Sequence, residues 1–243
     1  MKNAILFGST SEIGRAVIRE LCDLNNTKLT LVGSGIDIKS SLGFKGEQLL
    51  ELDWASPQTA SSLPLKLGAI EEADLVVVSL GFASKEDLQL DLMELQKSIQ
   101  ANLSWPLICV RSLHDAGKVK PMTQFVIISS ALVGLPTTRK SYVYSTLKNS
   151  LELIIKETVN AKKFIGDYIF LRPGYVPTKL NKHLSPGSFP STPEKVARQL
   201  NKKIKSGLSS GAVYAPAHIS GLAIAIRLIP KSILKSLLKK LQH

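Results

Sequence analysis

Seven short, nearly uninterrupted apolar runs constrain the fold of this chain more than any other feature. Strands that are apolar on both faces occur in parallel sheets whose two sides are covered by helices. Helical patterns separate the runs, the clearest over Leu92 to Ala116 and Tyr142 to Ala161. We therefore predict an α/β fold, a Rossmann-like, doubly wound parallel sheet of seven strands. The runs are "NAILFG", "KLTLVG", "QLLELD", "ADLVVVSLG", "TQFVIISS", "GDYIFLRPG" and "GAVYAP".

A chain of 243 residues fits one such domain. We divide it into a catalytic domain over residues 1–217 and a tail over residues 218–243. The two cysteines, Cys22 and Cys109, are far apart and lack metal-ligand spacing, so we expect reduced thiols and no metal. The first apolar run begins at once, and no apolar stretch reaches the roughly 20 residues of a membrane span. We expect a cytoplasmic location.

The net charge of +12 is concentrated in the last part of the chain. Residues 1–174 contain 19 basic and 18 acidic side chains, whereas residues 175–243 contain 12 basic side chains and one acidic side chain. Segregated charge of this kind predicts a face that meets an anionic surface. The polar, proline-containing stretch from Tyr175 to Ser191 is long enough to predict a lid or binding loop.

The tail "LIPKSILKSLLKKLQH" has the pattern of an amphipathic helix that lies in a membrane surface. Its lysines, Lys231, Lys235 and Lys239, recur every four residues opposite an apolar stripe. Packing of that stripe on its own domain, on a second copy of the chain or on a partner protein is the alternative. We expect no nucleic acid, because the lysines do not alternate with aromatic residues. The stripe consists of Ile229, Ile233, Leu234, Leu237, Leu238 and Leu241.

The segment "GSTSEIG", from Gly8 to Gly14, joins the first apolar run to a helical pattern. In doubly wound sheets this turn lies at a carboxyl end of a strand, where backbone amides and the helix dipole attract a pyrophosphate. Asp53, at the end of the third run, can accept a hydrogen bond from an adenine amino group or cap the helix that begins in "DWAS". The second run ends in "VGSG", which has neither the acid that selects NAD nor an arginine.

The segment "YVYSTLK" places Tyr144 and Lys148 four residues apart on one face of a predicted helix. An ammonium group beside a phenol lowers the pKa of the phenol toward neutrality, as proton transfer at that pH requires. Ser129 and Ser130 end the fifth run, where a hydroxyl group can hold a substrate oxygen. Asn102, in "QANLSWP", lies where a helix interior disfavours an amide, so it either has a role in the site or marks a helix kink or surface position.

Together these motifs resemble the short-chain dehydrogenase/reductase superfamily over nearly the whole chain. The resemblance implies an NADH cofactor, without excluding NADPH, and a catalytic group of Asn102, Ser130, Tyr144 and Lys148. Tyr144 would donate the proton, Lys148 would lower its pKa and hold the nicotinamide ribose, Ser130 would orient the carbonyl and Asn102 would hold a water. The implied cofactor contacts are Gly8, Thr10, Ser11, Ile13 and Gly14 for the pyrophosphate, Asp53 for adenine, Gly81 for ribose, Pro173, Gly174, Val176 and Thr178 for nicotinamide, and Tyr144 and Lys148.

Three departures from the superfamily pattern accompany this resemblance. Glu12 stands where the middle glycine of the phosphate turn is usual. Leu80-Gly81-Phe82 replaces the usual Asn-Ala-Gly after the fourth strand. The interval from Ser130 to Tyr144 is one residue longer than usual, which leaves Ser129 as an alternative to Ser130.

With the basic ending, "GSTSEIG", "FVIISSA", "YVYSTLK" and "LRPGYVPTKLNKHL" resemble the decaprenylphosphoryl-2-keto-ribose reductases. That narrower resemblance implies reduction of a keto group on a polyprenyl-phosphate-linked pentose, a step toward cell-wall arabinan. It also implies a flavin-dependent oxidase as partner and peripheral association with the inner membrane face. The alternatives are a general carbonyl or acyl-thioester reductase whose tail builds a homo-oligomer, and a non-catalytic dinucleotide-binding scaffold.

Overall fold

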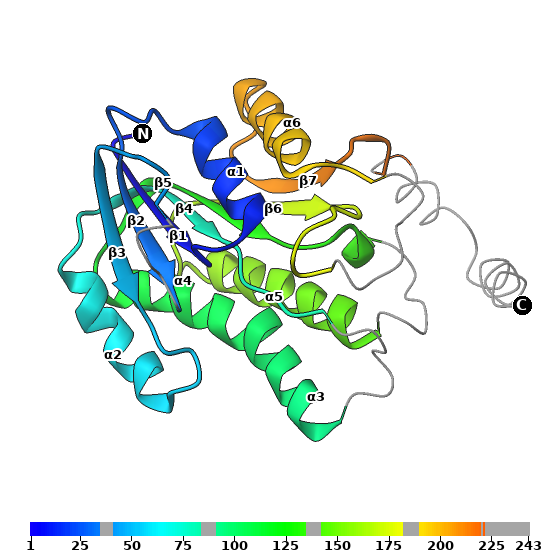
Figure 1. Ribbon diagram of the computed structural model, residues 1–243, viewed down its shortest axis with the longest axis horizontal. Coiled ribbons are helices and arrows are strands. Elements are labelled where there is room, and N and C mark those ends of the chain that lie inside the picture. Colours follow the sequence, from blue (N-terminus) through cyan, green and yellow to red (C-terminus); the bar gives the residue numbers. More distant parts are fainter. Residues whose placement is uncertain (35–40, 84–90, 135–141, 182–189, 220, 222–243) are drawn as a thin grey trace, which may run out of the picture.

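A single parallel sheet of seven strands forms the centre of the molecule (Figure 1). The computed structural model describes residues 1–34, 41–83, 91–134, 142–181, 190–219 and 221. The strand order is β3-β2-β1-β4-β5-β6-β7, and every neighbouring pair is parallel. The strands are β1 (Asn3–Phe7), β2 (Lys28–Gly33), β3 (Gly46–Glu51), β4 (Ala73–Val78), β5 (Val119–Ile128), β6 (Asp167–Pro173) and β7 (Gly211–Ala215).

Helices cover both faces of this sheet. α1 (Glu12–Leu21) and α6 (Pro193–Lys205) pack against each other on one face. α2 (Pro57–Gly68), α4 (Trp105–Asp115) and α5 (Tyr142–Asn160) contribute to the core on the other face, and α3 (Leu92–Ile99) leads into α4 (Figure 1). The predicted seven-stranded, doubly wound α/β fold is confirmed. In the described part of the chain, every helix is too short or too polar to cross a membrane.

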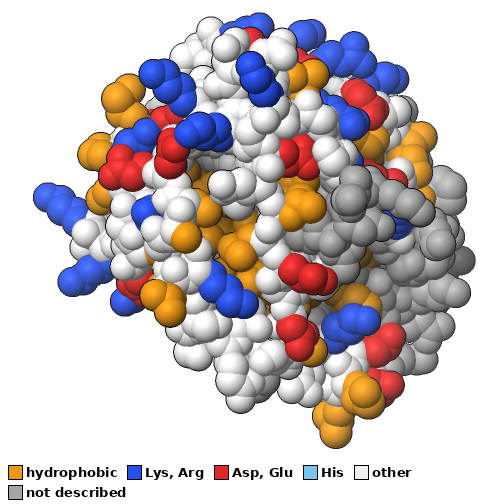
Figure 2. All heavy atoms as spheres, turned by 60° about the vertical axis from the view of Figure 1, so that its left-hand side comes forward, with side chains coloured by type: hydrophobic (Ala, Val, Ile, Leu, Met, Phe, Trp, Pro, Cys, Tyr) orange, Lys and Arg blue, Asp and Glu red, His pale blue; other side chains and the backbone are white. Residues whose placement is uncertain are grey.

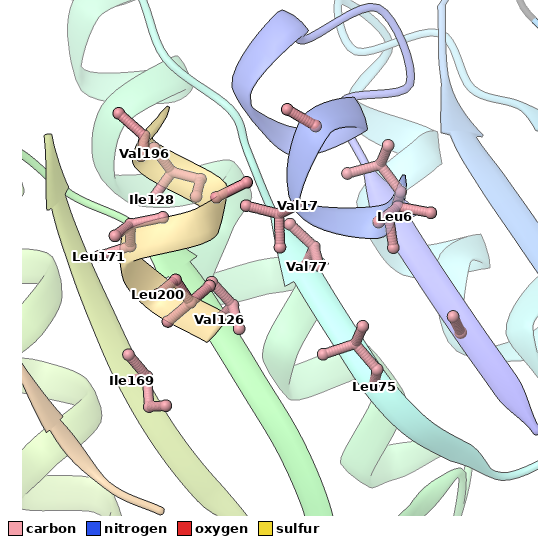
Figure 3. Close-up of a cluster of buried hydrophobic side chains, with 14 of the residues drawn as sticks. Leu6, Val17, Leu75, Val77, Val126, Ile128, Ile169, Leu171, Val196 and Leu200 are labelled. Carbon is pink, nitrogen blue, oxygen red and sulfur yellow. The ribbon is translucent and has the colours of Figure 1, made fainter. Parts of the chain in front are cut away.

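Alternating side chains of each strand divide the core into two clusters. Leu6, Leu75 and Val126 point toward α1 and α6, where they meet Val17 and Leu200 (Figure 3). Their sequence neighbours point to the opposite face and pack under α2, α4 and α5. This arrangement explains why the central runs are apolar throughout, since the inner strands are buried on both sides, whereas the edge strands β3 and β7 are partly exposed.

The long helix predicted from Leu92 to Ala116 is interrupted. Between α3 and α4 the chain forms one π-helical turn, η2 (Gln100–Ser104), with Asn102 buried inside it. Such single wide turns occur where a side chain is drawn out of the regular helix, often at a functional site. The helix is therefore irregular at Asn102, and because Asn102 is buried, the surface alternative is wrong.

Helix α6 was not singled out from the sequence, and α2 was expected only as a helix that begins in "DWAS", although the starts of both carry recognisable signals. Ser56 is the N-cap of α2 and precedes Pro57, and Thr192 is the N-cap of α6 and precedes Pro193. Proline is favoured in the first helical turn because the amide it lacks would have no partner there. The helix predicted from Ile229 lies outside the described residues, and so does most of the tail.

Replacing Leu75 by alanine tests the central packing of the sheet. The Leu75 side chain is fully buried on β4, and removing it leaves a cavity that we expect to lower the free energy of unfolding by about 2–5 kcal/mol. The matched control is Leu65→Ala on α2, where the leucine is 84% exposed and the change should stay within about 0.5 kcal/mol. Urea unfolding midpoints measure both variants. Equal midpoints would contradict the assigned core.

Candidate active site

The strand order reverses between β1 and β4, and the candidate site lies at the carboxyl ends of these two strands. β1 pairs with β2 on one side and with β4 on the other, so the segments that leave β1 and β4 run to opposite faces of the sheet. Ligands of doubly wound folds bind at such a switch point. Ser79, directly after β4, donates its backbone N–H to Phe7 O at 2.9 Å, and its hydroxyl lies 2.6 Å from the Ser11 hydroxyl.

The two glycines that bound the turn from Gly8 to Gly14 have no room for a side chain. Gly8 has a φ of +87°, and a Cβ there would lie 2.3 Å from the carbonyl oxygen of Ser79. A Cβ on Gly14 would lie 2.8 Å from Leu6 Cδ1 and 2.9 Å from Ser79 Cβ. Ser11 caps α1 by accepting the Gly14 N–H at 3.2 Å. The first turn of α1 therefore presents its amides and its positive dipole end at this position.

This turn contains a buried hydroxyl group that has no hydrogen-bond partner among the described residues. Among the described residues, the Ser9 hydroxyl is buried and makes no hydrogen bond to protein. It faces the end of β2, because a Cβ on Gly33 would lie 2.4 Å from Ser9 Oγ. Two glycine positions that exclude a Cβ, a helix N-terminus and an unsatisfied hydroxyl fit the pyrophosphate and ribose of a dinucleotide. The predicted contacts Thr10, which is exposed, and Ile13, which is half-buried, belong to the same turn.

Glu12, the departure from the superfamily glycine, contacts the segment that follows β6. It is the first residue of α1, and its Oε2 accepts the backbone N–H of Lys179 at 2.9 Å. Lys179 belongs to a short segment folded by Asn181, whose Oδ1 accepts the N–H of Thr178 at 2.9 Å. No sequence signal connects residues 167 positions apart, so this contact was not foreseen.

Lys148 is fully buried at the ends of two strands. Its Nζ donates to the carbonyl oxygen of Leu80 at 2.9 Å and to that of Ile128 at 3.2 Å. The Tyr144 ring lies one turn away on α5, with its centroid 6.0 Å from Lys148 Nζ. The Tyr144 hydroxyl makes a side-chain hydrogen bond with Ser130. The structure thus brings Ser130, Tyr144 and Lys148 together.

Asn102 is connected to this group by hydrogen bonds to the segment that follows β4. Its Nδ2 donates to Phe82 O at 2.8 Å and to Ser98 Oγ at 3.3 Å, and its Oδ1 accepts the Phe82 N–H at 3.2 Å. Gly81 lies between the two polar groups, because a Cβ there would be 3.3 Å from Asn102 Oδ1 and 3.6 Å from Lys148 Nζ. Asn102 therefore shapes the backbone at Gly81, the predicted ribose contact.

The two serines that end β5 face different environments. Ser129 is buried and donates its hydroxyl to Glu152 Oε1 at 2.6 Å. Ser130 is hydrogen-bonded to Tyr144 and is the second residue past the strand. Of the two alternatives left by the sequence, the geometry favours Ser130 as the hydroxyl next to the phenol.

One electrostatic expectation is not met. Burial raises the pKa of Tyr144 to about 12, and only the hydrogen bond with Ser130 opposes this rise. The expected lowering by Lys148 is absent because the ammonium group is held by two carbonyl oxygens and not by the phenol. Burial lowers the pKa of Lys148 to about 8, against the opposing charge of Glu152.

The remaining predicted cofactor contacts lie on the rim of the site. Asp53 is exposed just beyond β3 and accepts the Ala55 N–H at 2.9 Å, whereas Ser56 caps α2, so the capping alternative for Asp53 is wrong. Pro173 ends β6. The Gly174 N–H donates to the carbonyl oxygen of Ala215 at 2.9 Å. The adenine and nicotinamide roles stay predictions.

Val176 and Thr178 follow β6 into the segment next to α1. The Val176 side chain is buried in the cluster under α1 and α6, so a nicotinamide contact there would use its backbone. Leu180 reaches toward the site, with Cδ2 3.8 Å from the position of a Cβ on Gly81. Within the described ranges, no group of three or more histidine, cysteine, aspartate or glutamate side chains is arranged to hold a metal ion.

Comparison with known proteins shows low sequence similarity but a shared fold. No family model matches the chain. It is 25% identical over 107 residues to an uncharacterized oxidoreductase of Mycobacterium tuberculosis, a match that covers 44% of this chain and 42% of that protein. The chain thus matches about two fifths of the length of this curated relative. A second strain of the same organism has a protein that matches to the same extent.

Solved structures match over most of the chain. A short-chain dehydrogenase from Burkholderia cenocepacia in complex with NADP has a TM-score of 0.75 at 14% identity, covering 98% of this chain and 99% of its own. A short-chain dehydrogenase family protein from Francisella tularensis has a TM-score of 0.73 at 16% identity, covering 91% and 99%. An alcohol dehydrogenase from Thermococcus sibiricus with 5-hydroxy-NADP has 0.68 at 19%, covering 88% and 95%. The chain has the fold of these proteins.

Gly8→Ala tests the phosphate turn. Because Gly8 has a positive φ and no space for a Cβ, we expect the substitution to lower affinity for NADPH by at least tenfold, about 1–2 kcal/mol from the backbone conformation alone. Gly68→Ala is the matched control, since a Cβ at the end of α2 meets no atom within 4 Å. Nicotinamide fluorescence titration measures both variants. Wild-type affinity in Gly8→Ala would show that the turn does not bind the dinucleotide.

Proposed function

We propose that this chain, which has the short-chain dehydrogenase/reductase fold, is an NAD(P)H-dependent reductase of carbonyl groups. The observation that carries the proposal is the hydrogen-bonded pair of Ser130 and Tyr144 one helical turn from buried Lys148. This group lies at the switch point of the sheet, beside the Gly8 to Gly14 turn. A nicotinamide cofactor is supported by the NADP of the Burkholderia neighbour, the 5-hydroxy-NADP of the Thermococcus neighbour and the oxidoreductase name of the mycobacterial relative.

A bound nicotinamide would supply the hydride, and the residues of this chain would handle the proton. Tyr144 donates the proton to the oxygen of the reduced carbonyl, while the Ser130 hydroxyl orients that oxygen. A tyrosine whose pKa is raised to about 12 is fully protonated at neutral pH, as the donor in a reduction must be. The alkoxide it protonates is a stronger base than a phenolate, so the transfer remains downhill. The phenol is therefore in its donor form at the start of the reduction.

Both NADH and NADPH are compatible with the described part of the cofactor site. Gly33 and Ser34, at the end of β2, offer no carboxylate that would repel a 2′-phosphate. Arg15 lies nearby, with Nη1 donating to Ser9 O at 3.0 Å and Nη2 to Ser41 O at 3.1 Å. The preference for NADH inferred from the sequence resemblance remains a prediction.

For the substrate, we propose a keto-pentose carried on a polyprenyl phosphate, as in decaprenylphosphoryl-2-keto-ribose. Its support is the sequence resemblance and the basic, leucine-rich tail. A decaprenyl chain cannot be carried free in water, because each buried methylene is worth about 0.8 kcal/mol, so the enzyme would work at the membrane surface. A flavin-dependent oxidase that forms the keto group is the corresponding partner, and the inner face of the membrane the corresponding location.

The described basic residues are compatible with that surface. Most of the face in Figure 2 carries interspersed positive and negative side chains. α6 differs, because it has one acidic residue, Glu194, and a set of exposed basic residues, and its chain leads toward the tail. These are Lys195, Arg198, Lys202, Lys203 and Lys205.

A general carbonyl or acyl-thioester reductase that forms a homo-oligomer is the second candidate. It is favoured by exposed apolar side chains on the central helices, including Leu153 at 54% and Ile154 at 41% exposure on α5. A non-catalytic scaffold is disfavoured, because it has no use for a buried lysine beside a hydrogen-bonded phenol.

Tyr144→Phe tests the proposed reaction. Without the phenol hydroxyl no proton donor remains, so we expect turnover of a ketone substrate to fall by about 10²–10⁴-fold. Binding of NADPH or NADH should stay within twofold of wild type. The control is Tyr142→Phe on the same helix, where the tyrosine is 40% exposed and the change should leave turnover intact. Oxidation of both cofactors, followed by absorbance, provides the readout, and wild-type turnover in Tyr144→Phe would reject the assigned role.

Flotation with anionic liposomes tests the membrane proposal on the full chain. Lys231, Lys235 and Lys239 are replaced together by glutamine, which we expect to weaken lipid binding by roughly two orders of magnitude, at about 1 kcal/mol per lysine. The control replaces the exposed lysines Lys45, Lys66 and Lys163, so that the net charge is matched.

Truncation would be less informative, because a Cβ on Gly174 would lie 2.6 Å from Ile219 Cδ1, so the start of the tail packs at the end of β6. Equal flotation of the two triple variants would favour the oligomeric reductase instead.

A further inference from the structure

A buried carboxylate that the proposed reaction does not use lies one helical turn beyond Lys148. Glu152 is 1% exposed on α5. Its Oε1 accepts Ser129 Oγ at 2.6 Å and Arg172 Nε at 2.9 Å, and its Oε2 accepts Arg172 Nη2 at 2.6 Å and Lys156 Nζ at 3.3 Å. Both oxygens are therefore satisfied, and the carboxylate is held in one orientation.

Arg172 extends this network across the sheet. It is 6% exposed on β6, and its Nη1 donates to Tyr214 Oη on β7 at 2.6 Å. The guanidinium also lies over the Tyr214 ring, 5.1 Å from the centroid. Through one ion pair, Glu152 thus connects α5 to β5, β6 and β7.

Stability alone does not account for such a network. Buried ion pairs can often be replaced by apolar side chains of similar volume without loss of stability, because the cost of desolvation offsets the attraction. The position of the network is more informative. Glu152 lies four residues after Lys148, so both project from one side of α5. Its partner Ser129 directly precedes Ser130.

We propose that Glu152, clamped by Arg172, is a positioning residue that keeps Lys148 in its charged form and orients the end of β5 that bears Ser130. The inference rests on the proposed reductase function for its effect on rate. It also predicts a property of the protein that is measurable without turnover, the protonation of Lys148.

The charges around Lys148 determine the sign of the effect. α5 contributes Tyr144, Glu152 and Lys156, β6 contributes Arg172 and β7 contributes Tyr214, whereas β4 and β5 contribute only neutral carbonyl and hydroxyl groups. Arg172 holds the pKa of Glu152 below its usual range, and Glu152 raises the pKa of Arg172 in turn. Lys148, whose pKa burial lowers to about 8, therefore titrates while the pair stays charged.

Glu152→Gln removes the negative charge, retains the side-chain shape and leaves Arg172 positive. The ammonium form of Lys148 is then less favoured, so Lys148 should lose its proton at a lower pH. We expect its titration midpoint to fall by about one pH unit, at the low end of the shifts that a neighbouring opposite charge causes. The rate of ketone reduction should fall at alkaline pH as Lys148 loses its proton. This alkaline limb of the pH–rate profile should therefore move to lower pH by the same amount.

Two measurements report the shift. The first is the carbon NMR signal of the Lys148 ε-methylene against pH, without substrate, assigned by its loss in Lys148→Gln. The second is the pH dependence of ketone reduction. Lys156→Gln is the control, since this lysine is 46% exposed and contacts the same carboxylate from the solvent side. Its removal should move neither the midpoint nor the limb, because exposed ion pairs are weak.

The outcomes separate the two proposals. A folded Glu152→Gln variant whose midpoint and limb both stay at the wild-type values would overturn the role of Glu152. If that variant does not fold, Glu152→Gln combined with Arg172→Gln decides, because it removes both charges of the buried ion pair together and its midpoint should still lie below wild type. A shifted midpoint in a protein that reduces no carbonyl would instead reject the proposed function and leave the positioning role intact.

Discussion

The organisation of the candidate site depends on how a buried ammonium group is satisfied. Lys148 donates to the carbonyl oxygens of Leu80 and Ile128, at the ends of two adjacent parallel strands. A buried charge is tolerated only if it is hydrogen-bonded and electrostatically compensated. The strand ends provide the hydrogen bonds, and Glu152 contributes to the electrostatic compensation. α5 is thereby fixed to the sheet at the position where Tyr144 and Ser130 meet.

The same burial acts in opposite directions on the two titrating groups of the site. It disfavours the charged form of each, so the pKa of Tyr144 rises while that of Lys148 falls. In this arrangement the phenol is a proton donor at neutral pH, which suits a reductase. A buried ion pair next to such a site can shift the pKa values of its titrating groups, because a unit charge acts strongly on its neighbours in a low-dielectric interior.

Much of the fold could be predicted from the sequence because its signals are local. All seven strands coincide with or overlap the apolar runs. Gly8 and Gly14 could be recognised because a strand-to-helix turn of this kind needs glycine where a Cβ does not fit. The Tyr144–Lys148 spacing could also be read directly, because a helix places residues four apart on one face. The interruption of the long helix at Asn102 was indicated by an amide in an unfavourable position, although its partner Phe82 was not.

The sequence by itself determined the parallel α/β architecture, the glycine turn and the spacing of the catalytic candidates, because each depends on the period or backbone freedom of a short segment. Only the tertiary structure decided between Ser129 and Ser130, docked Glu12 on Lys179 and joined Glu152 to Arg172. It also reversed the expected direction of the Tyr144 pKa. These features depend on burial and on contacts between distant segments, and neither has a local signature in the chain.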